Sequence, residues 1–206
     1  MENFDRKNHW ENIYQTKQLN EVSWYQPTPQ TSINFIEQFN LPKSANIIDV
    51  GGGDSFLVDY LIDNNYQNIT VLDISEAAID RAKKRLGNKA SKINWIVSDI
   101  VQFNTTDKFN FWHDRAAFHF LTKKKEIASY IQLVQNKINT DGILVIGTFS
   151  EQGPLKCSGI NIKQYSENSM TSLLSNSFEK INCFTTNHQT PFNTLQNFLF
   201  CSFKKL

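Results

Sequence analysis

An aspartate and three glycines stand together in the segment IIDVGGGDS. Gly51, Gly52 and Gly53 have no Cβ, so the chain can turn tightly there and approach a ligand closely. Asp49 precedes them and adds a negative charge, which would repel a pyrophosphate and attract a cationic group. Ser55 ends the segment where loops of this kind often carry a further glycine. A plain structural turn would also explain the glycines alone, but Asp49 favours a site for a positively charged ligand.

Two further aspartates follow the next two apolar runs. Asp73 lies in VLDIS, where a carboxylate can accept hydrogen bonds from both hydroxyls of a ribose, and Ile74 beside it could lie against an adenine ring. Asp99 and Ile100 follow in VSDI. Each aspartate alone would fit a helix cap or a turn. Their repeated place at the ends of successive strands instead predicts a nucleoside site.

The segment FWHDRAAFHFL holds a second group of reactive side chains. His113 and His119 titrate in the range useful for a general base, and Asp114 could accept a proton or orient a nucleophile. Arg115 could clamp a carboxylate or another oxyanion. The structural alternative is that Asp114 caps a helix, Arg115 pairs with it and His119 packs in the core. We predict catalytic roles for these four residues and an additional cofactor contact for His113.

Substrate contacts are expected from three other parts of the chain. Aromatic residues in SWYQ could fold over the cofactor, and a long loop over 148–160 could cover the substrate. The last segments of the chain could add polar groups at the same rim. The predicted substrate residues are Trp24, Tyr25, Cys157, Tyr165 and His188.

Apolar patterns predict the elements that would position these residues. Short apolar runs predict five strands, over Asn46–Val50, Asn68–Ile74, Ile93–Val97, Phe109–His113 and Gly142–Phe149. Helical spacing predicts helices between them, over Ser55–Asn64, Ser75–Gly87 and Lys124–Ile138. A helix near Glu167–Ser175 precedes two β-rich runs, Phe178–Thr185 and Gln196–Phe203. We therefore expect an α/β fold: a Rossmann-like, doubly wound, seven-stranded, mostly parallel sheet with a C-terminal antiparallel β-hairpin.

The first 45 residues predict helices around Asp5–Tyr14 and Thr31–Phe39, with two prolines between them. We treat residues 1–45 as an N-terminal helical lid or appendage and residues 46–206 as one domain, which the length of 206 residues accommodates.

Residues from about 45 to 150 resemble the core of class I methyltransferases, which bind S-adenosylmethionine (SAM). The resemblance rests on IIDVGGGDS, VLDIS and VSDI, and the terminal hairpin fits it too. It implies SAM as cofactor and S-adenosylhomocysteine as product, with Asp99 at the adenine amino group. It also implies that the acceptor reacts at the ends of strands four and five. The methyltransferase domain would then comprise residues 46–206.

Two subfamilies are similar to separate parts of the chain. WHDRAAFHFL resembles the WDRG segment of thiopurine and related thiol methyltransferases, with Ala116 where glycine is usual. VGGGDSFLVDYL and NITVLDISEAAI resemble seven-strand protein-lysine methyltransferases, which usually carry Asp-Lys-Gly where this chain has Asp114-Arg115-Ala116. We expect a small thiol, amine or similar soft nucleophile as acceptor, with protein lysine as the alternative. A nucleotide-binding oxidoreductase or a non-catalytic SAM-binding module is the second alternative.

Composition limits the other classes of function. The 21 basic and 20 acidic residues nearly cancel, which argues against nucleic acid or an anionic membrane as partner. A polar start without a signal-like apolar run predicts a cytoplasmic protein, and its three cysteines are then expected as reduced thiols. We expect no metal site and a monomer or homodimer.

Overall fold

Seven strands form one sheet in the computed structural model, which describes residues 4–206. The strand order is β3-β2-β1-β4-β5-β9-β8, and all pairs among β1 to β5 are parallel. The strands are β1 (Asn46–Val50), β2 (Asn68–Asp73), β3 (Ile93–Val97), β4 (Phe109–Arg115), β5 (Ile138–Phe149), β8 (Phe178–Gln189) and β9 (Leu195–Lys205). Because β9 is antiparallel to both β5 and β8, the predicted seven-stranded sheet with a C-terminal hairpin is confirmed.

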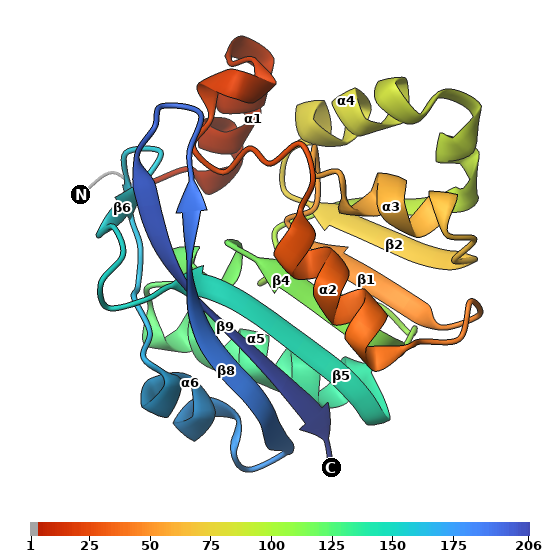
Figure 1. Ribbon diagram of the computed structural model, residues 1–206, viewed down its shortest axis with the longest axis vertical. Helices are drawn as coiled ribbons and strands as arrows, with labels where there is room; N and C mark the ends of the chain where they lie inside the picture. The colour runs from red at the N-terminus through yellow and green to blue at the C-terminus, as the bar shows by residue number, and fades with distance from the viewer. Residues whose placement is uncertain (1–3) are drawn as a thin grey trace.

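Helices cover both faces of this sheet (Figure 1). One face packs against α2 (Gln30–Phe39) and α3 (Leu57–Asp63), and the other packs against α5 (Lys124–Lys137) and α6 (Glu167–Leu174). The remaining helices are α1 (Arg6–Thr16) and α4 (Glu76–Leu86), with the 3₁₀ turns η1 (Leu19–Glu21), η2 (Gly87–Lys92) and η3 (Phe118–Phe120).

Successive side chains of a strand point to opposite faces, so each strand contributes to both cores. In β4, Phe111 packs in the cluster under α2 and α3, while Trp112 packs in the cluster under α5 and α6. The same alternation sends His113 and Arg115 to the side of Phe111, and it sends Asp114 to the side of Trp112. This difference decides which of them can reach a ligand.

Helix α4 ends where its sequence predicts. The Ser75 hydroxyl accepts a hydrogen bond from the Ala78 N–H, and Glu76 stands in the first turn. Lys83, Lys84 and Arg85 occupy the last turn, where positive charge is favourable, and a positive-φ Gly87 follows.

Two stretches differ from the predictions. Strand β5 begins at Ile138 rather than Gly142, and its pairing with β4 is irregular around Phe109 and Phe111. The stretch expected as a long loop contains a short antiparallel pair, β6 (Lys156–Cys157) and β7 (Ile160–Asn161). Apolar periodicity is too weak in such short segments to reveal a strand.

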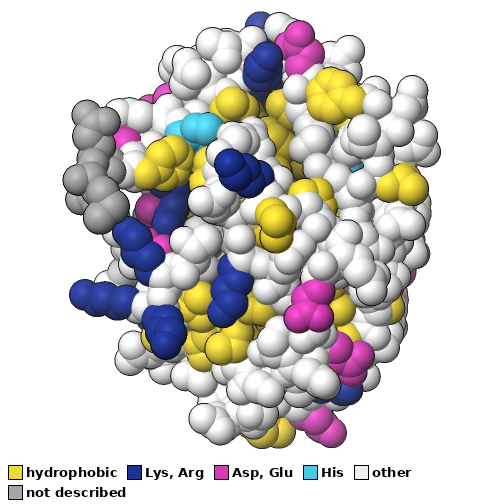
Figure 2. All heavy atoms as spheres, turned by 90° about the vertical axis from the view of Figure 1, so that its left-hand side faces the viewer, with side chains coloured by type: hydrophobic (Ala, Val, Ile, Leu, Met, Phe, Trp, Pro, Cys, Tyr) yellow, Lys and Arg dark blue, Asp and Glu magenta, His cyan; other side chains and the backbone are white. Residues whose placement is uncertain are grey.

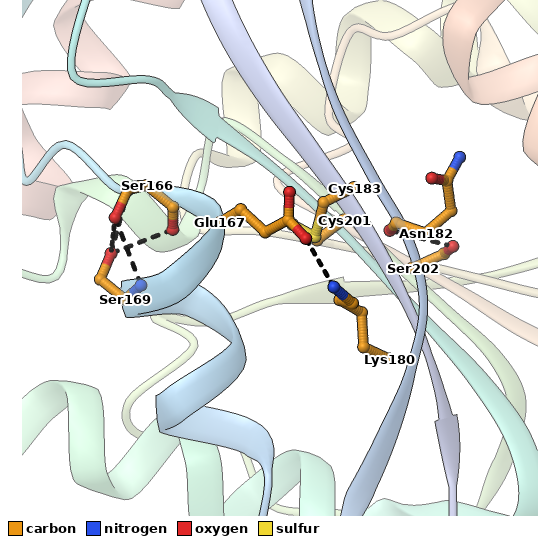
Figure 3. Close-up of a disulfide and its surroundings, with 8 residues drawn as sticks. All are labelled: Ser166, Glu167, Ser169, Lys180, Asn182, Cys183, Cys201 and Ser202. Carbon is orange, nitrogen blue, oxygen red and sulfur yellow. Dashed lines mark hydrogen bonds and ion pairs between the residues drawn. A yellow bond between two sulfur atoms is a disulfide. The ribbon is translucent and has the colours of Figure 1, made fainter.

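The cysteine prediction was wrong for two of the three residues. Cys183 and Cys201 face each other across β8 and β9 and form a disulfide, and Cys157 is the free cysteine (Figure 3). The pairing depends on the register of the hairpin, which the spacing of the cysteines along the sequence does not reveal. In the same region, Lys180 of β8 pairs with Glu167 at the start of α6.

On the face shown in Figure 2, hydrophobic side chains are exposed in separate groups between polar ones. The most exposed large hydrophobic residues include Leu155, before β6, Phe192, between β8 and β9, and Leu195, the first residue of β9. Every helix within residues 4–206 is too short or too polar to cross a bilayer.

Candidate active site

A pocket lies at the carboxyl ends of β1, β2, β3 and β4, which is where open α/β sheets bind ligands. It contains most of the residues predicted to bind the cofactor. They are Asp49, Gly51, Gly52, Ser55, Asp73, Ile74, Asp99, Ile100 and His113. Gly53 does not line the pocket and instead donates its N–H to the Asp73 carboxylate, 3.0 Å away.

Asp49 and His113 are direct neighbours on the parallel strands β1 and β4. The His113 Nδ1 atom lies 2.7 Å from one carboxylate oxygen of Asp49, and its Nε2 atom lies 2.9 Å from the Ser32 hydroxyl. All three side chains are buried and line the pocket. The chain thus places a carboxylate, an imidazole and a hydroxyl in one hydrogen-bonded row.

The other Asp49 oxygen, Oδ2, is buried without a hydrogen-bond partner. A buried carboxylate oxygen is costly unless a positive or hydrogen-bonding group meets it. A Cβ on Gly52 would lie 2.4 Å from this oxygen, so only glycine leaves the space above it open. Gly51 has φ +68°, a conformation that favours glycine, and an added Cβ there would lie 2.9 Å from the Ala117 Cβ. These features fit a cofactor that carries a sulfonium and an amino group.

Asp73 is buried between backbone donors. Its carboxylate accepts hydrogen bonds from the N–H groups of Gly53 and Ser75, at 3.0 Å and 2.8 Å. Burial nevertheless raises the pKa of Asp73 to about 7, and these two hydrogen bonds oppose that increase. Each oxygen retains a lone pair, so the side chain can accept hydrogen bonds from a ribose.

Asp99 is held by the N-terminal helix. Arg6 of α1 donates to both Asp99 oxygens, at 3.2 Å and 3.0 Å, and its other nitrogen reaches Glu126 at 3.1 Å. Glu11 of the same helix accepts hydrogen bonds from the Ser75 hydroxyl and the Ala77 N–H at the start of α4. Helix α1 is therefore attached both at Asp99 and at the start of α4, and Figure 1 shows it beside α4.

Aromatic residues from the N-terminal segment line the pocket. Trp10 is buried and contacts Trp24 and Phe120 edge to face, with centroids 5.5 Å and 4.9 Å apart. Tyr14 and Tyr25 also line the pocket. Trp24 and Tyr25, two predicted substrate residues, are thus brought to the pocket together with aromatic residues that were not singled out individually.

Arg115 also lines the pocket, as predicted. One guanidinium nitrogen donates to the Trp24 carbonyl at 3.2 Å, and the guanidinium lies over the Phe198 ring, 5.1 Å from its centroid. The following residue, Ala116, has φ +68°. This left-handed conformation gives a physical reason for the glycine that is usual at this position in the thiol methyltransferases.

Asp114 does not reach the pocket. It is fully buried on the opposite side of β4, where it accepts hydrogen bonds from the Ala117 and Phe118 N–H groups and the Tyr130 hydroxyl. Burial raises its pKa to about 6. This arrangement is the capping role that the sequence left as the structural alternative, although Arg115 is not its partner.

His119 and Tyr165, also predicted at the site, pack in the interior instead. The His119 Nδ1 atom accepts a hydrogen bond from the Phe149 N–H at 3.3 Å, and burial lowers the pKa of His119 to about 3. Tyr165 stacks on Phe118, with centroids 5.2 Å apart. A neutral, enclosed imidazole and an enclosed phenol are core residues here.

Of the predicted substrate residues Cys157 and His188, only Cys157 lines the pocket. Cys157 lines it and is buried, and burial raises the pKa of its thiol to about 11, so the thiol stays protonated at neutral pH. His188 lies outside the lining, where its ring nitrogens meet the Ser23 carbonyl at 2.7 Å and the Gln26 amide at 3.3 Å. It positions the N-terminal segment that covers the pocket.

Several lining residues were not predicted at all. Arg6, Ser32, Arg81, Phe120 and Leu121 line the pocket from helices or from the segment after β4. Arg6 and Ser32 come from the segment predicted as a helical lid or appendage, and no local motif marks them. Within residues 4–206, no group of three or more His, Cys, Asp or Glu side chains could hold a metal ion.

The strand order and the acidic, glycine-lined pocket define a class I methyltransferase fold. A family model described as "Methyltransferase domain" matches residues 41–197, which is more than half of the chain, so the chain belongs to this family of SAM-dependent methyltransferases.

Two curated relatives and two solved structures illustrate the breadth of this family. The eEF1A lysine and N-terminal methyltransferase of Mus musculus is 28% identical over 104 residues, which are 50% of this chain and 15% of that protein. Nodulation protein S of Rhizobium tropici is 29% identical over 104 residues, 50% of this chain and 43% of that protein. The chain therefore spans less than half the length of these relatives.

Among solved structures, one from work on the conversion of a disulfide bond into a thioacetal group during echinomycin biosynthesis has a TM-score of 0.78 and 15% identity. The superposed region covers 97% of this chain and 92% of the chain in that structure. The N-methyltransferase NodS from Bradyrhizobium japonicum WM9, in complex with S-adenosylhomocysteine, has a TM-score of 0.73 and 16% identity, covering 98% and 99%. At these identities the likeness establishes the fold.

Proposed function

We propose that this chain transfers the methyl group of SAM to a small molecule with a thiol or amine nucleophile. The observation that carries the small-molecule acceptor is the N-terminal cover. Trp10, Tyr14, Trp24 and Tyr25 line the pocket, so an acceptor bound there would share it with four aromatic side chains. A folded protein substrate would instead need an open groove.

The residues present fit SAM. Asp49 Oδ2 offers an unpartnered negative charge to its sulfonium and amino groups, Asp73 offers acceptors to the ribose, and Asp99 offers an acceptor to the adenine amino group. When bound, SAM supplies an electrophilic methyl group at the sulfonium.

The chain's own contribution to the reaction is alignment, exclusion of water and removal of the acceptor's proton. His113 can take that proton at Nε2 through the Ser32 hydroxyl, which lies 2.9 Å away, while its Nδ1 atom is held 2.7 Å from the Asp49 carboxylate. Ser32→Ala should lower turnover about tenfold or more while the affinity for S-adenosylhomocysteine stays within about twofold. Unchanged turnover in this variant would refute the relay.

The first test is calorimetric titration with SAM, S-adenosylhomocysteine and NAD in parallel. Binding of the first two without NAD is expected, and binding of NAD alone would replace this proposal with a nucleotide-binding oxidoreductase. Radiolabelled SAM then distinguishes small thiols and amines from proteins as acceptors. SAM binding without transfer to any acceptor would favour a non-catalytic binding module.

Protein lysine is the second candidate acceptor. The name of the mouse relative, a lysine and N-terminal methyltransferase, favours it. Transfer of label to protein bands, with none to small thiols or amines, would establish this candidate and overturn the first.

A further inference from the structure

Three arginines line the pocket, and they differ in their partners. Arg6 pairs with Asp99 and Glu126, at 3.0 Å and 3.1 Å. Arg81 pairs with Asp54 at 3.5 Å. Among residues 4–206, no carboxylate forms an ion pair with Arg115, although the charge of Asp49 in the same pocket acts on it from a greater distance.

The surroundings of Arg115 satisfy only part of its hydrogen-bonding capacity. Its Nη1 atom donates to the Trp24 carbonyl, while its Nη2 atom is buried without a partner. The Phe198 ring lies under the guanidinium and supplies no acceptor in its plane. Burial lowers the pKa of Arg115 to about 10, which still leaves it charged at neutral pH.

A buried positive charge with a free donor is expensive unless an anion meets it. A guanidinium offers two parallel N–H groups, which match the two oxygens of a carboxylate. The unpartnered Nη2 donor of Arg115 is therefore the feature of this site that favours an anionic ligand.

The position of Arg115 assigns that ligand to the acceptor rather than to the nucleoside. Arg115 is two residues beyond His113 on the same side of β4, and its register partner on β5 is Gly147. Asp73 and Asp99 lie in or after β2 and β3, on the other side of β1. The contacts of Arg115 come from Trp24 in the N-terminal cover and Phe198 on β9.

We propose that Arg115 binds a carboxylate carried by the methyl acceptor, so that the acceptors of this enzyme are small carboxylic acids with a nearby thiol or amine. This inference rests on the proposed function and narrows its substrate class. The carboxylate would hold the acceptor at β4 while its nucleophile lies near His113 and Ser32.

The test uses the full chain saturated with S-adenosylhomocysteine. Acetate, propionate, benzoate and 2-mercaptobenzoate are titrated calorimetrically beside their neutral amides. At least one carboxylate should bind about tenfold more tightly than its amide. Equal affinities across all four pairs, or no binding of any of them, would overturn the proposal.

Variants of Arg115 test whether this side chain causes the preference for carboxylates over amides. Arg115→Met should abolish it, and Arg115→Lys, which keeps the charge without the fork, should retain part of it. The exposed Lys84→Met, on α4, is the matched control and should leave the preference unchanged. A preference that survives in folded Arg115→Met would place the carboxylate elsewhere and refute the assignment.

Titration of S-adenosylhomocysteine itself separates the two possible sources of a carboxylate. Its affinity should stay within about twofold in Arg115→Met. A loss of about tenfold or more would mean that Arg115 serves the carboxylate of the cofactor, and the proposal would fail. If the unmodified chain binds neither SAM nor S-adenosylhomocysteine, the proposed function fails first, which distinguishes the two failures.

Discussion

The end of the pocket that we propose for the nucleoside and the end that we propose for the acceptor are built from different kinds of contact. We call them the nucleoside end and the acceptor end. At the nucleoside end, Asp49, Asp73 and Asp99 come from three neighbouring strands, and each already has a hydrogen-bond donor from the chain. At the acceptor end, Arg115 meets Trp24, which is far from it in sequence, and keeps one donor unpartnered. The positions of the three aspartates follow from local strand-to-helix motifs, whereas the surroundings of Arg115 depend on how distant segments pack.

This contrast teaches that one end of a pocket can be built from local strand-end motifs while the other depends on contacts between distant segments. Strand ends fix where the acids stand, because parallel strands bring their carboxyl ends to one edge. Residues of the N-terminal segment line the acceptor end, and the Ser23 carbonyl of this segment lies 2.7 Å from the His188 Nε2 atom. The following predictions run from the largest expected effect to the smallest.

The largest expected effect comes from comparing Asp114 with Arg115. They are adjacent in β4, and only Arg115 lines the pocket. Asp114→Ala should lower the free energy of unfolding by about 4 kcal/mol, because it leaves three buried donors without their acceptor. Turnover per folded molecule should change little. Urea denaturation measures the first effect, with the exposed Asp80→Ala as control; a stable but inactive variant would instead give Asp114 a catalytic role.

At the nucleoside end, Asp73→Asn should weaken binding of S-adenosylhomocysteine by about 2 kcal/mol, or about thirtyfold. The amide keeps one acceptor oxygen but loses the charge that strengthens hydrogen bonds. Calorimetric titration at pH 8, above the Asp73 pKa of about 7, measures the change against Asp80→Asn. Equal affinities would remove Asp73 from the cofactor site.

The interior position of His119 predicts a pH dependence. Because the folded-state pKa is about 3 and the unfolded value is about 6.5, the unfolded chain binds the extra proton between these values. The stabilising contribution of neutral His119 is therefore complete above pH 6.5 and is lost as the pH falls towards 3. Relative to His119→Asn, the free energy of unfolding should fall by about 2 kcal/mol from pH 7 to pH 5. A constant difference would show that His119 is accessible to protons and water.

The smallest effect concerns the turn after Arg115. Ala116→Gly should raise the free energy of unfolding by about 1 kcal/mol, because glycine adopts the observed φ of +68° without strain. Thermal and urea denaturation measure it. A destabilised variant would show that packing of the Ala116 methyl group outweighs the backbone strain.

Much of the nucleoside end could be predicted from sequence, because its signals are local. Glycines, aspartates and strand ends fall within short segments, and the strand order follows the usual rules for alternating strands and helices. The acceptor end could be predicted only in part. His113 and Arg115 reach the pocket, but Asp114 between them does not, and the alternation of side chains along a strand already distinguished them.

Other contacts could not be predicted from the neighbouring sequence. Nothing near Tyr165 indicates that it stacks on Phe118, and nothing near Ser32 indicates that it meets His113. The disulfide likewise depends on the register of β8 against β9. These contacts join residues that are distant in sequence, and sequence periodicity carries no information about such pairs.

The ion pair between Arg6 and Asp99 makes the N-terminal helix part of a thermodynamic cycle. Asp99 is at once an anchor of α1 and a wall of the pocket, so a ligand that draws on its oxygens acts on the same carboxylate as the helix. Reciprocity then requires that the factor by which docking of α1 changes ligand affinity equals the factor by which the ligand changes docking of α1. Binding of a ligand that takes up the Asp99 carboxylate would therefore be coupled in free energy to the docking of α1.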